Sequence, residues 1–136
     1  MTTDCVLDTS ALIAYVREEP GWERVQERLR FGRRFMHAVN MAEFLYAAPN
    51  RMPERFTPDS ALAWFYAADI DVANLFDPDF LRLSAQIRLK EKSLNVGDGL
   101  AVALASKLNL PLVTAEGNFK RTHEYARIEL IRERKT

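Results

Sequence analysis

Short apolar runs alternate with amphipathic helical patterns along this chain. Runs of apolar and β-branched residues bounded by proline, glycine or charged positions predict short strands. Five are expected, at residues 5–7, 35–39, 70–75, 111–114 and 128–131. The first and the fourth are the most apolar, so we expect both to be buried in the interior of a sheet.

Helical spacing of apolar residues fills most of the gaps between these strands. Thr57 and Asp77 each precede a proline, which is the sequence of an N-cap and a first helical residue. Pro49 and Pro53 are expected to end the helix that starts at Asn40 and runs through Ala48. Helices are predicted at residues 10–16, 21–31, 40–48, 58–67 and 99–108, with another after Pro78. The 99–108 segment is apolar on nearly every side, which indicates a helix packed deep against the sheet.

Strands that alternate with helices predict an α/β fold, a three-layer α/β/α arrangement with a short, mainly parallel sheet. The chain has 136 residues, 48% of them apolar, which suits one domain spanning residues 1–136. Its nineteen basic and nineteen acidic side chains cancel. Any binding of a polyanion must therefore come from a local patch or from metal ions.

The composition predicts a soluble, cytoplasmic protein without a membrane segment. Residues 1–4 carry no basic charge, and no apolar run approaches the ~20 residues that span a bilayer. The single Cys5 is expected to be a buried thiol rather than a nucleophile, because no base is placed beside it. The basic tail Arg132–Lys135 is expected to be frayed.

Acidic residues follow the predicted strands. Asp8 comes directly after the first strand, Glu43 lies in the first turn after the second, and Glu116 comes two residues after Thr114. Asp98 opens the apolar helix. In an open parallel sheet, ligands bind outside the carboxyl ends of the strands, so these acids are the candidate site.

Each acid also has a structural interpretation. Asn40 and Glu43 have the spacing of a capping box, Asp98 could be an acid favoured by the helix dipole, and Glu116 a solvated turn residue. Asp8 is harder to explain this way, because Thr9 and Ser10 already supply caps for the next helix. Four acids at one edge would repel each other without a cation among them, and hard cations such as Mg²⁺ prefer carboxylate oxygens.

Four segments resemble the motifs of PIN-domain nucleases, and of VapC-type toxins in particular. They occur in the family's order and cover the whole chain: VLDTSALIA (6–14), NMAE (40–43), GDGLAVALA (97–105) and LVTAEGNF (112–119). Asp8, Glu43 and Asp98 match the family's acidic positions. Family members usually carry Asp where this chain has Glu116, often a further Asp at Asn118, and more commonly Ala at Gly99.

The resemblance implies a metal-dependent endoribonuclease, a homodimer, and a small cognate antitoxin that fills the acidic pocket. We expect Asp8 and Asp98 to hold Mg²⁺ or Mn²⁺ directly, with Glu43 and Glu116 acting through water or a second, weaker site. Residues expected to support the acids are Ser10, Asn40 and Thr114. For Ser10, a helix N-terminal hydrogen bond is an equal alternative.

The expected substrate is RNA, in single-stranded form because an unstacked strand reaches a cleft more easily than a duplex. Candidates for phosphate contacts are Arg33, Arg34, Lys90, Lys92, Lys120 and Arg121. The early and middle helices carry an apolar surplus, which comprises Ala11, Leu12, Tyr15, Trp64 and Phe65. Core packing explains most of these residues, and a patch left over would favour the dimer.

Two rival functions can be distinguished. A phosphatase built on a nucleophilic Asp would usually carry a second Asp two residues later, where this chain has Ser10. A non-catalytic PIN-fold binding module, whose altered fourth motif has lost metal, is the other alternative. Metal titration separates this module from the nuclease.

Overall fold

A computed structural model describes residues 3–132. The predicted frayed tail at Arg132–Lys135 lies outside the described residues, except for Arg132. Five parallel strands form one sheet in the order β3-β2-β1-β4-β5. The strands are β1 (Cys5–Leu7), β2 (Arg34–His37), β3 (Asp71–Ala73), β4 (Leu112–Thr114) and β5 (Ile128–Leu130). All five predicted strands are therefore present, and the parallel α/β class is confirmed.

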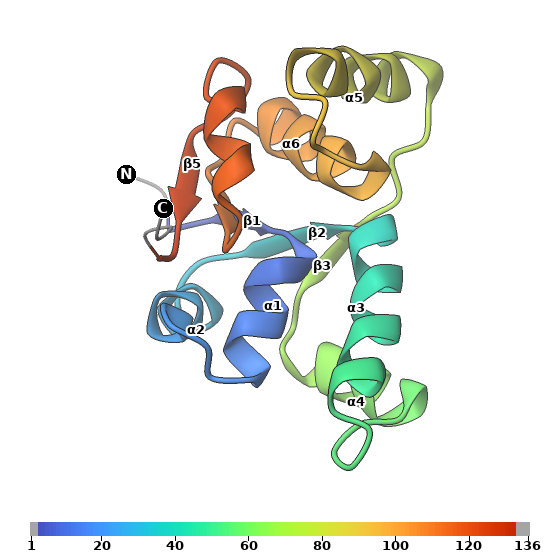
Figure 1. The fold of residues 1–136 in the computed structure, drawn as a ribbon, viewed down its shortest axis with the longest axis vertical. Coiled ribbons are helices and arrows are strands. Elements are labelled where there is room, and N and C mark those ends of the chain that lie inside the picture. Colours follow the sequence, from blue (N-terminus) through green and yellow to red (C-terminus); the bar gives the residue numbers. More distant parts are fainter. Residues whose placement is uncertain (1–2, 133–136) are drawn as a thin grey trace.

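Helices cover both faces of this sheet (Figure 1). Those packed on one face are α1 (Thr9–Val16), α2 (Trp22–Arg30), α3 (Ala38–Arg51) and α4 (Pro58–Ala67). Those on the other are α5 (Pro78–Lys90), α6 (Val96–Leu108) and the 3₁₀ helix η1 (Gly117–Thr122). This is the predicted three-layer arrangement.

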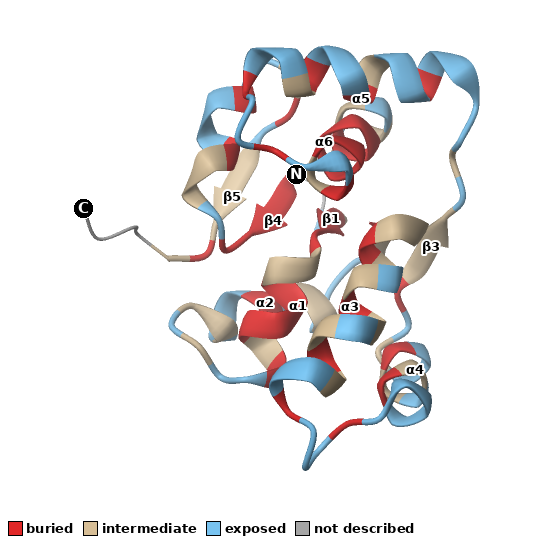
Figure 2. Cartoon of the chain, turned by 45° about the vertical axis from the view of Figure 1, so that its right-hand side comes forward, coloured by how far each residue is buried: buried red, intermediate tan, exposed pale blue. Residues whose placement is uncertain are grey.

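Alternate residues of the central strand feed the two cores. Cys5 and Leu7 pack with α1 to α4, whereas Val6 packs with α5 and α6. The strands β1 and β4 and the helix α6 are accordingly the most buried elements (Figure 2). Burial raises the pKa of the Cys5 thiol to about 12, so this residue is a neutral core side chain, as expected.

Two predicted helix boundaries were wrong at α3. The second strand ends at His37 rather than at residue 39, because the His37 ring accepts the Val39 amide at 3.1 Å and caps α3. The helix also continues through Pro49 to Arg51. Pro49 removes the hydrogen bond that its own amide would make and crowds the carbonyl four residues earlier, but the Met52 amide still closes the last turn on Ala48 at 2.9 Å.

Glycine at position 99 serves the packing of α5 on α6. A Cβ built there would lie 2.8 Å from both Ser84 Oγ and Arg88 Cγ, on the α5 side. Glycine here, where family members more commonly carry Ala, therefore allows the two helices to pack closely. In addition, α6 begins three residues earlier than predicted, at Val96, and Asn95 caps it.

The apolar residues that suggested a dimer lie in the core. Ala11, Leu12 and Phe65 are fully buried, and the partly buried rings of Tyr15 and Trp64 pack with their centroids 6.1 Å apart. This part of the dimer reasoning was wrong. In the described chain, the exposed large apolar side chains are others: Phe31, Tyr46, Tyr66, Phe76, Leu81, Leu89 and Val96. No helix within residues 3–132 is long and apolar enough to cross a membrane.

Candidate active site

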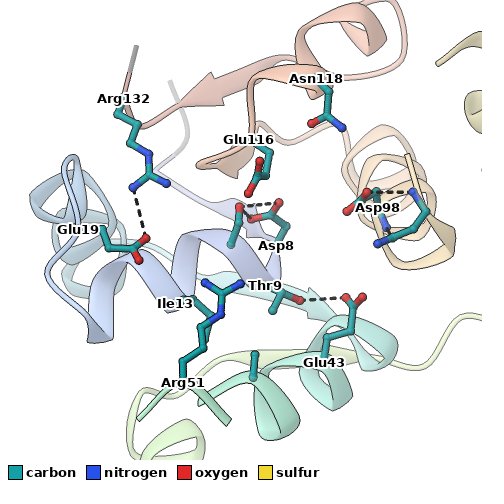
Figure 3. A pocket seen from close by; sticks show the side chains of 13 residues that line it. Asp8, Thr9, Ile13, Glu19, Glu43, Arg51, Asp98, Glu116, Asn118 and Arg132 are labelled. Atoms are coloured by element: carbon teal, nitrogen blue, oxygen red, sulfur yellow. Dashed lines mark hydrogen bonds and ion pairs between the residues drawn. The ribbon is translucent and has the colours of Figure 1, made fainter. Parts of the chain in front are cut away.

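A cavity of about 320 Å³ opens at the carboxyl edge of the sheet, and all four predicted acids line it (Figure 3). Asp8 follows β1 and Glu116 follows β4, two neighbouring strands that belong to opposite halves of the sheet. Glu43 comes from α3 and Asp98 from the start of α6. The cavity therefore lies at the topological switch point, where open α/β sheets bind their ligands.

Asp8 is the most buried of these acids, at 2% exposure. Its Oδ1 accepts the Ala11 amide at 3.0 Å, and its carboxylate also accepts the hydroxyls of Ser10 and Thr114, at 2.8 and 2.7 Å. Burial raises the pKa of Asp8 to about 7, even though these hydrogen bonds act to lower it. Asp8 itself is the N-cap of α1, so the expectation that Thr9 or Ser10 would cap this helix was wrong.

Glu43 is held by two side chains and by a close backbone approach. Its Oε1 accepts from Thr9 Oγ1 at 3.0 Å and from Asn40 Nδ2 at 2.9 Å. A Cβ built at Gly97 would lie only 2.6 to 2.8 Å from the Glu43 carboxylate. Gly97 thus lets Glu43 reach the start of α6. The capping-box interpretation was wrong, because Asn40 lies inside α3 and is not its N-cap.

Asp98 forms part of the cap of α6 and also lines the cavity. One of its oxygens accepts the Asn95 amide at 3.0 Å, and Asn95 Oδ1 accepts the Asp98 amide at 2.8 Å, which completes a capping box. Burial, followed by the charges of Glu43 and Glu116, raises the pKa of Asp98. The acids therefore interact electrostatically across the cavity.

Glu116 is exposed, and no side-chain hydrogen bond caps η1 from this position. Its backbone amide donates to Thr114 Oγ1 at 3.1 Å, which ties the turn after β4 to the Asp8 network. The neighbouring Asn118 also lines the cavity and donates to Ser93 Oγ at 3.2 Å. The Glu116 carboxylate is the least constrained of the four.

The three residues predicted to support the acids all contact them. Ser10 Oγ bonds the Asp8 carboxylate and accepts the Ala115 amide at 3.0 Å, so it connects β4 to Asp8. Thr114 is fully buried against Asp8, and Asn40 bonds both Glu43 and the Gly97 carbonyl. Whether they serve catalysis stays a prediction.

The six predicted phosphate-contacting cations do not line the cavity. Arg33 pairs with Asp71 at 2.9 Å and Arg34 bonds the Ala68 carbonyl at 2.7 Å, both near the start of β2 and thus at the opposite edge. Lys90 and Arg121 pair with Glu124 and Glu91, at 3.6 and 3.4 Å. Lys92 and Lys120 are exposed. The cations that do line the cavity were missed by the sequence reasoning: Arg51 and Arg132.

The site offers oxygen ligands in an open arrangement. Within residues 3–132, no three His, Cys, Asp or Glu side chains stand close enough together to hold a metal ion as they are. Zinc sites are built mainly on Cys and His ligands, whereas Mg²⁺ keeps several waters and binds through one or two carboxylates. The donors here fit a hydrated Mg²⁺ or Mn²⁺ rather than zinc. His37 is buried and bonded to the Leu75 carbonyl at 2.9 Å, so it has a structural role.

Several of the solved structures that this chain resembles are described as toxin–antitoxin proteins. A toxin–antitoxin complex from Klebsiella pneumoniae matches with a TM-score of 0.69 and 17% identity, over 95% of this chain and 98% of that one. VapBC2 from Rickettsia felis, bound to a DNA fragment from its promoter, gives 0.67 and 15%, over 93% and 98%. VapBC-5 from Mycobacterium tuberculosis gives 0.59 and 24%, over 96% and 99%. At these identities the likeness shows the fold.

No curated protein sequence matches this one. The family model described as the PIN domain matches residues 5–125, which hold β1 to β4, the six α-helices and every residue that lines the acidic cavity except Arg132. Because that match extends over most of the sequence, this chain belongs to the PIN domain family.

Proposed function

We propose that this protein is a Mg²⁺- or Mn²⁺-dependent endoribonuclease and the toxin of a type II toxin–antitoxin pair. The observation that carries the proposal is the cavity at the carboxyl edge of the sheet, where four carboxylates from four segments meet in a PIN domain. None of these carboxylates forms an ion pair with a described residue. Uncompensated acids at a ligand-binding edge suit a divalent cation.

Asp8 and Asp98 would hold the cation, with Glu43 and Glu116 completing the site through water. When bound, Mg²⁺ or Mn²⁺ would supply a water of lowered pKa and neutralise charge on the phosphoryl oxygens. The protein's own part is to hold the carboxylates in place. Ser10 and Thr114 fix Asp8, while Thr9 and Asn40 fix Glu43.

Because Asp8 is buried, cation binding at this residue is coupled to the release of a proton. With its pKa near 7, Asp8 is partly protonated at neutral pH in the absence of a cation. A cation binds the ionised form, so binding releases a proton. Metal affinity should therefore rise between pH 6 and pH 8.

The test uses purified protein and a labelled single-stranded RNA, with Mg²⁺ or Mn²⁺ titrated and a chelator as the blank. Asp8→Asn and Asp98→Asn should each lower cleavage about a hundredfold or more, because each removes a direct cation ligand. Asp79→Asn is the matched control, since its side chain is 89% exposed on α5. Full cleavage by both cavity variants would sink the mechanism.

The toxin assignment is supported by the solved structures that share the fold, which are toxin–antitoxin complexes. A partner with a guanidinium group could fill the acidic cavity, because its planar fork suits carboxylates. Co-expression with the product of the neighbouring small gene should yield a complex without ribonuclease activity. A complex that leaves Asp8, Glu43 and Asp98 open to Mn²⁺ would show that inhibition works another way.

A homodimer is also proposed, now on the exposed apolar side chains rather than on those first considered. Leu89 and Tyr46 are each 71% exposed on α5 and α3. These helices lie on opposite faces of the sheet, so each residue marks a separate candidate contact, and a two-fold dimer would bury the one at its axis twice. Sedimentation at micromolar concentration should show a dimer, and a monomer alone would contradict this part of the proposal.

One observation favours the binding module as a second candidate. The described acids form no ready-made metal cluster, and Glu116 and Asn118 replace the usual family residues at the cavity. A protein that has lost catalysis would bind neither Mn²⁺ nor Mg²⁺ in its free state. Calorimetric titration with Mn²⁺ separates the two functions, because the nuclease requires binding.

A further inference from the structure

Two arginines share the acidic cavity with the carboxylates (Figure 3). Arg132 is tied to its surroundings, because its Nη1 lies 3.4 Å from Glu19 Oε1 and 3.3 Å from the Pro20 carbonyl. Arg51 is different. Its guanidinium points into the cavity, yet no residue within 3–132 hydrogen bonds or ion-pairs with it.

The continuation of α3 past Pro49 explains why Arg51 reaches the cavity. Glu43, Ala47 and Arg51 are spaced four residues apart on this helix, and all three line the cavity. Residues at this spacing share one face of a helix. A helix ending before Pro49 would leave Arg51 outside this stripe.

The floor between the acids and Arg51 is small and apolar. Ala47 and Ile13 line the cavity there, and neither fills it with a polar group that would compete for a ligand. Eight residues of helix rise about 12 Å, which separates the backbone of Arg51 from that of Glu43. The Arg51 guanidinium is therefore placed to contact a part of the ligand beside the acids rather than the acids themselves.

An arginine placed to neutralise the acids would form an ion pair with one of them. Arg51 approaches no described carboxylate within 4 Å. Its five donors remain available in a planar fork that matches the oxygens of a phosphate. In an otherwise acidic cavity, a single unpaired cation compensates a ligand that brings its own negative charge.

We propose that Arg51 binds the RNA phosphate next to the one that is cleaved, and so positions the strand across the acids. This inference rests on the proposed ribonuclease function. An interaction with a neighbouring phosphate is made equally in the ground state and the transition state, so it acts on KM and leaves kcat nearly unchanged. Arg51 is a substrate-binding residue in this scheme, separate from the cation ligands.

The experiment compares Arg51→Gln with Arg51→Lys and with the control Arg82→Gln. Arg82 lies on the exposed surface of α5, outside the cavity, so this control removes the same charge elsewhere. Arg51→Gln should raise KM about tenfold with kcat within twofold, the loss expected for one charge-assisted contact. Arg51→Lys should recover part of that loss, and Arg82→Gln should match the parent.

Binding is measured separately, with single-stranded RNA and protein carrying Asp98→Asn, which stops cleavage. Adding Arg51→Gln should lower the slope of log Kd against log salt by about 0.7, the value for one lost phosphate contact on a single strand. If the parent cleaves RNA but Arg51→Gln leaves KM, Kd and the salt slope unchanged, the role of Arg51 is overturned and the proposed function stands. A parent that neither cleaves nor binds RNA would overturn the proposed function and this inference together.

Discussion

The two edges of the parallel sheet differ in whether their charged side chains form ion pairs within the protein. At the carboxyl edge, five carboxylates line a cavity of about 320 Å³. Glu19 pairs there with Arg132, but Asp8, Glu43, Asp98 and Glu116 form no ion pair with any described residue. At the amino edge, a hollow of about 780 Å³ is lined by arginines and glutamates, and Arg28 and Glu129 pair there through two hydrogen bonds of 2.5 and 3.1 Å.

The larger hollow is therefore not the better candidate for the site. There, Arg28 and Glu129 compensate each other, which stabilises the fold at that edge. In the smaller cavity, Asp8, Glu43, Asp98 and Glu116 have no ion-pair partner among the described residues, and the pKa values of Asp8 and Asp98 are raised. Perturbed titratable groups in a cleft indicate a functional site better than the volume of the cleft does. Four changes, from the largest expected effect to the smallest, test this contrast.

The largest effect concerns the pH dependence of stability in metal-free buffer. Burial raises the pKa of Asp8 from 3.8 to about 7, so the folded state holds this proton more tightly than the unfolded state. The resulting stability is fully present below pH 4 and is lost as the pH rises through 7. It amounts to at most about 4 kcal/mol, at 1.36 kcal/mol per pKa unit.

Asp8→Asn should remove this loss, because asparagine keeps the cap of α1 and carries no charge. The unfolding free energy of the variant minus that of the parent should rise from pH 5 to pH 8, as measured by denaturant titration. Added Mg²⁺ should shrink the difference by stabilising the parent. A difference that stays constant with pH would show that Asp8 is not a buried, costly carboxylate.

The second effect is on cleavage, through Gly97. The Cβ of Gly97→Ala would press on the Glu43 carboxylate at 2.6 to 2.8 Å and move it from its place beside Asp98. We expect cleavage to fall about a hundredfold, as for a displaced group near a metal site. Gly99→Ala is the control, because its Cβ meets α5 and should lower the melting temperature rather than the rate. Equal loss of cleavage in both variants would contradict the role of Gly97.

The third effect belongs to the amino edge. Glu129→Gln breaks the bidentate pair with Arg28, whose side chain is only 18% exposed. The unfolding free energy should fall by about 1 to 2 kcal/mol, since a half-buried guanidinium loses its partner. Thermal unfolding and RNA cleavage are measured on the same preparation. A loss of cleavage with unchanged stability would reverse the contrast between the two edges.

The smallest effect concerns Glu116, the exposed acid of the cavity. If it acts through water, Glu116→Asp restores the usual family side chain and should raise Mg²⁺-dependent cleavage a few-fold, because Mg²⁺ tolerates little error in geometry. Glu116→Gln should reduce it. Mn²⁺ should support the parent better than Mg²⁺ does. Parent-like Mg²⁺ titrations for both variants would make Glu116 a turn residue.

The positions of the strands, and of the acids at their carboxyl ends, could be predicted from the sequence because both depend on local pattern. An acid within two residues of the end of an apolar run lies at the carboxyl edge of a parallel strand, whatever packs around it. Asp8 and Glu116 are of this kind. Glu43 and Asp98 needed the resemblance to a family as well, since their local spacing equally fitted helix caps.

The remainder depended on contacts that local pattern does not specify. Pro49 is an ordinary helix breaker by sequence, yet the helix continues for two residues beyond it and thereby brings Arg51 to the cavity. The spacing of Glu43, Ala47 and Arg51 was the available signal, and the proline obscured it. Arg33 and Arg34 were chosen by charge alone, and their places at the opposite edge follow from the direction of β2.

Cys5 is a natural probe of how often the native protein opens. It is the single cysteine in the sequence, it is fully enclosed in the central strand, and its thiol is held neutral. An alkylating reagent attacks the thiolate, so it can label this protein only after the sheet has opened. The rate at which the native protein incorporates such a label therefore reports how often the core is breached, and it does so without an engineered probe.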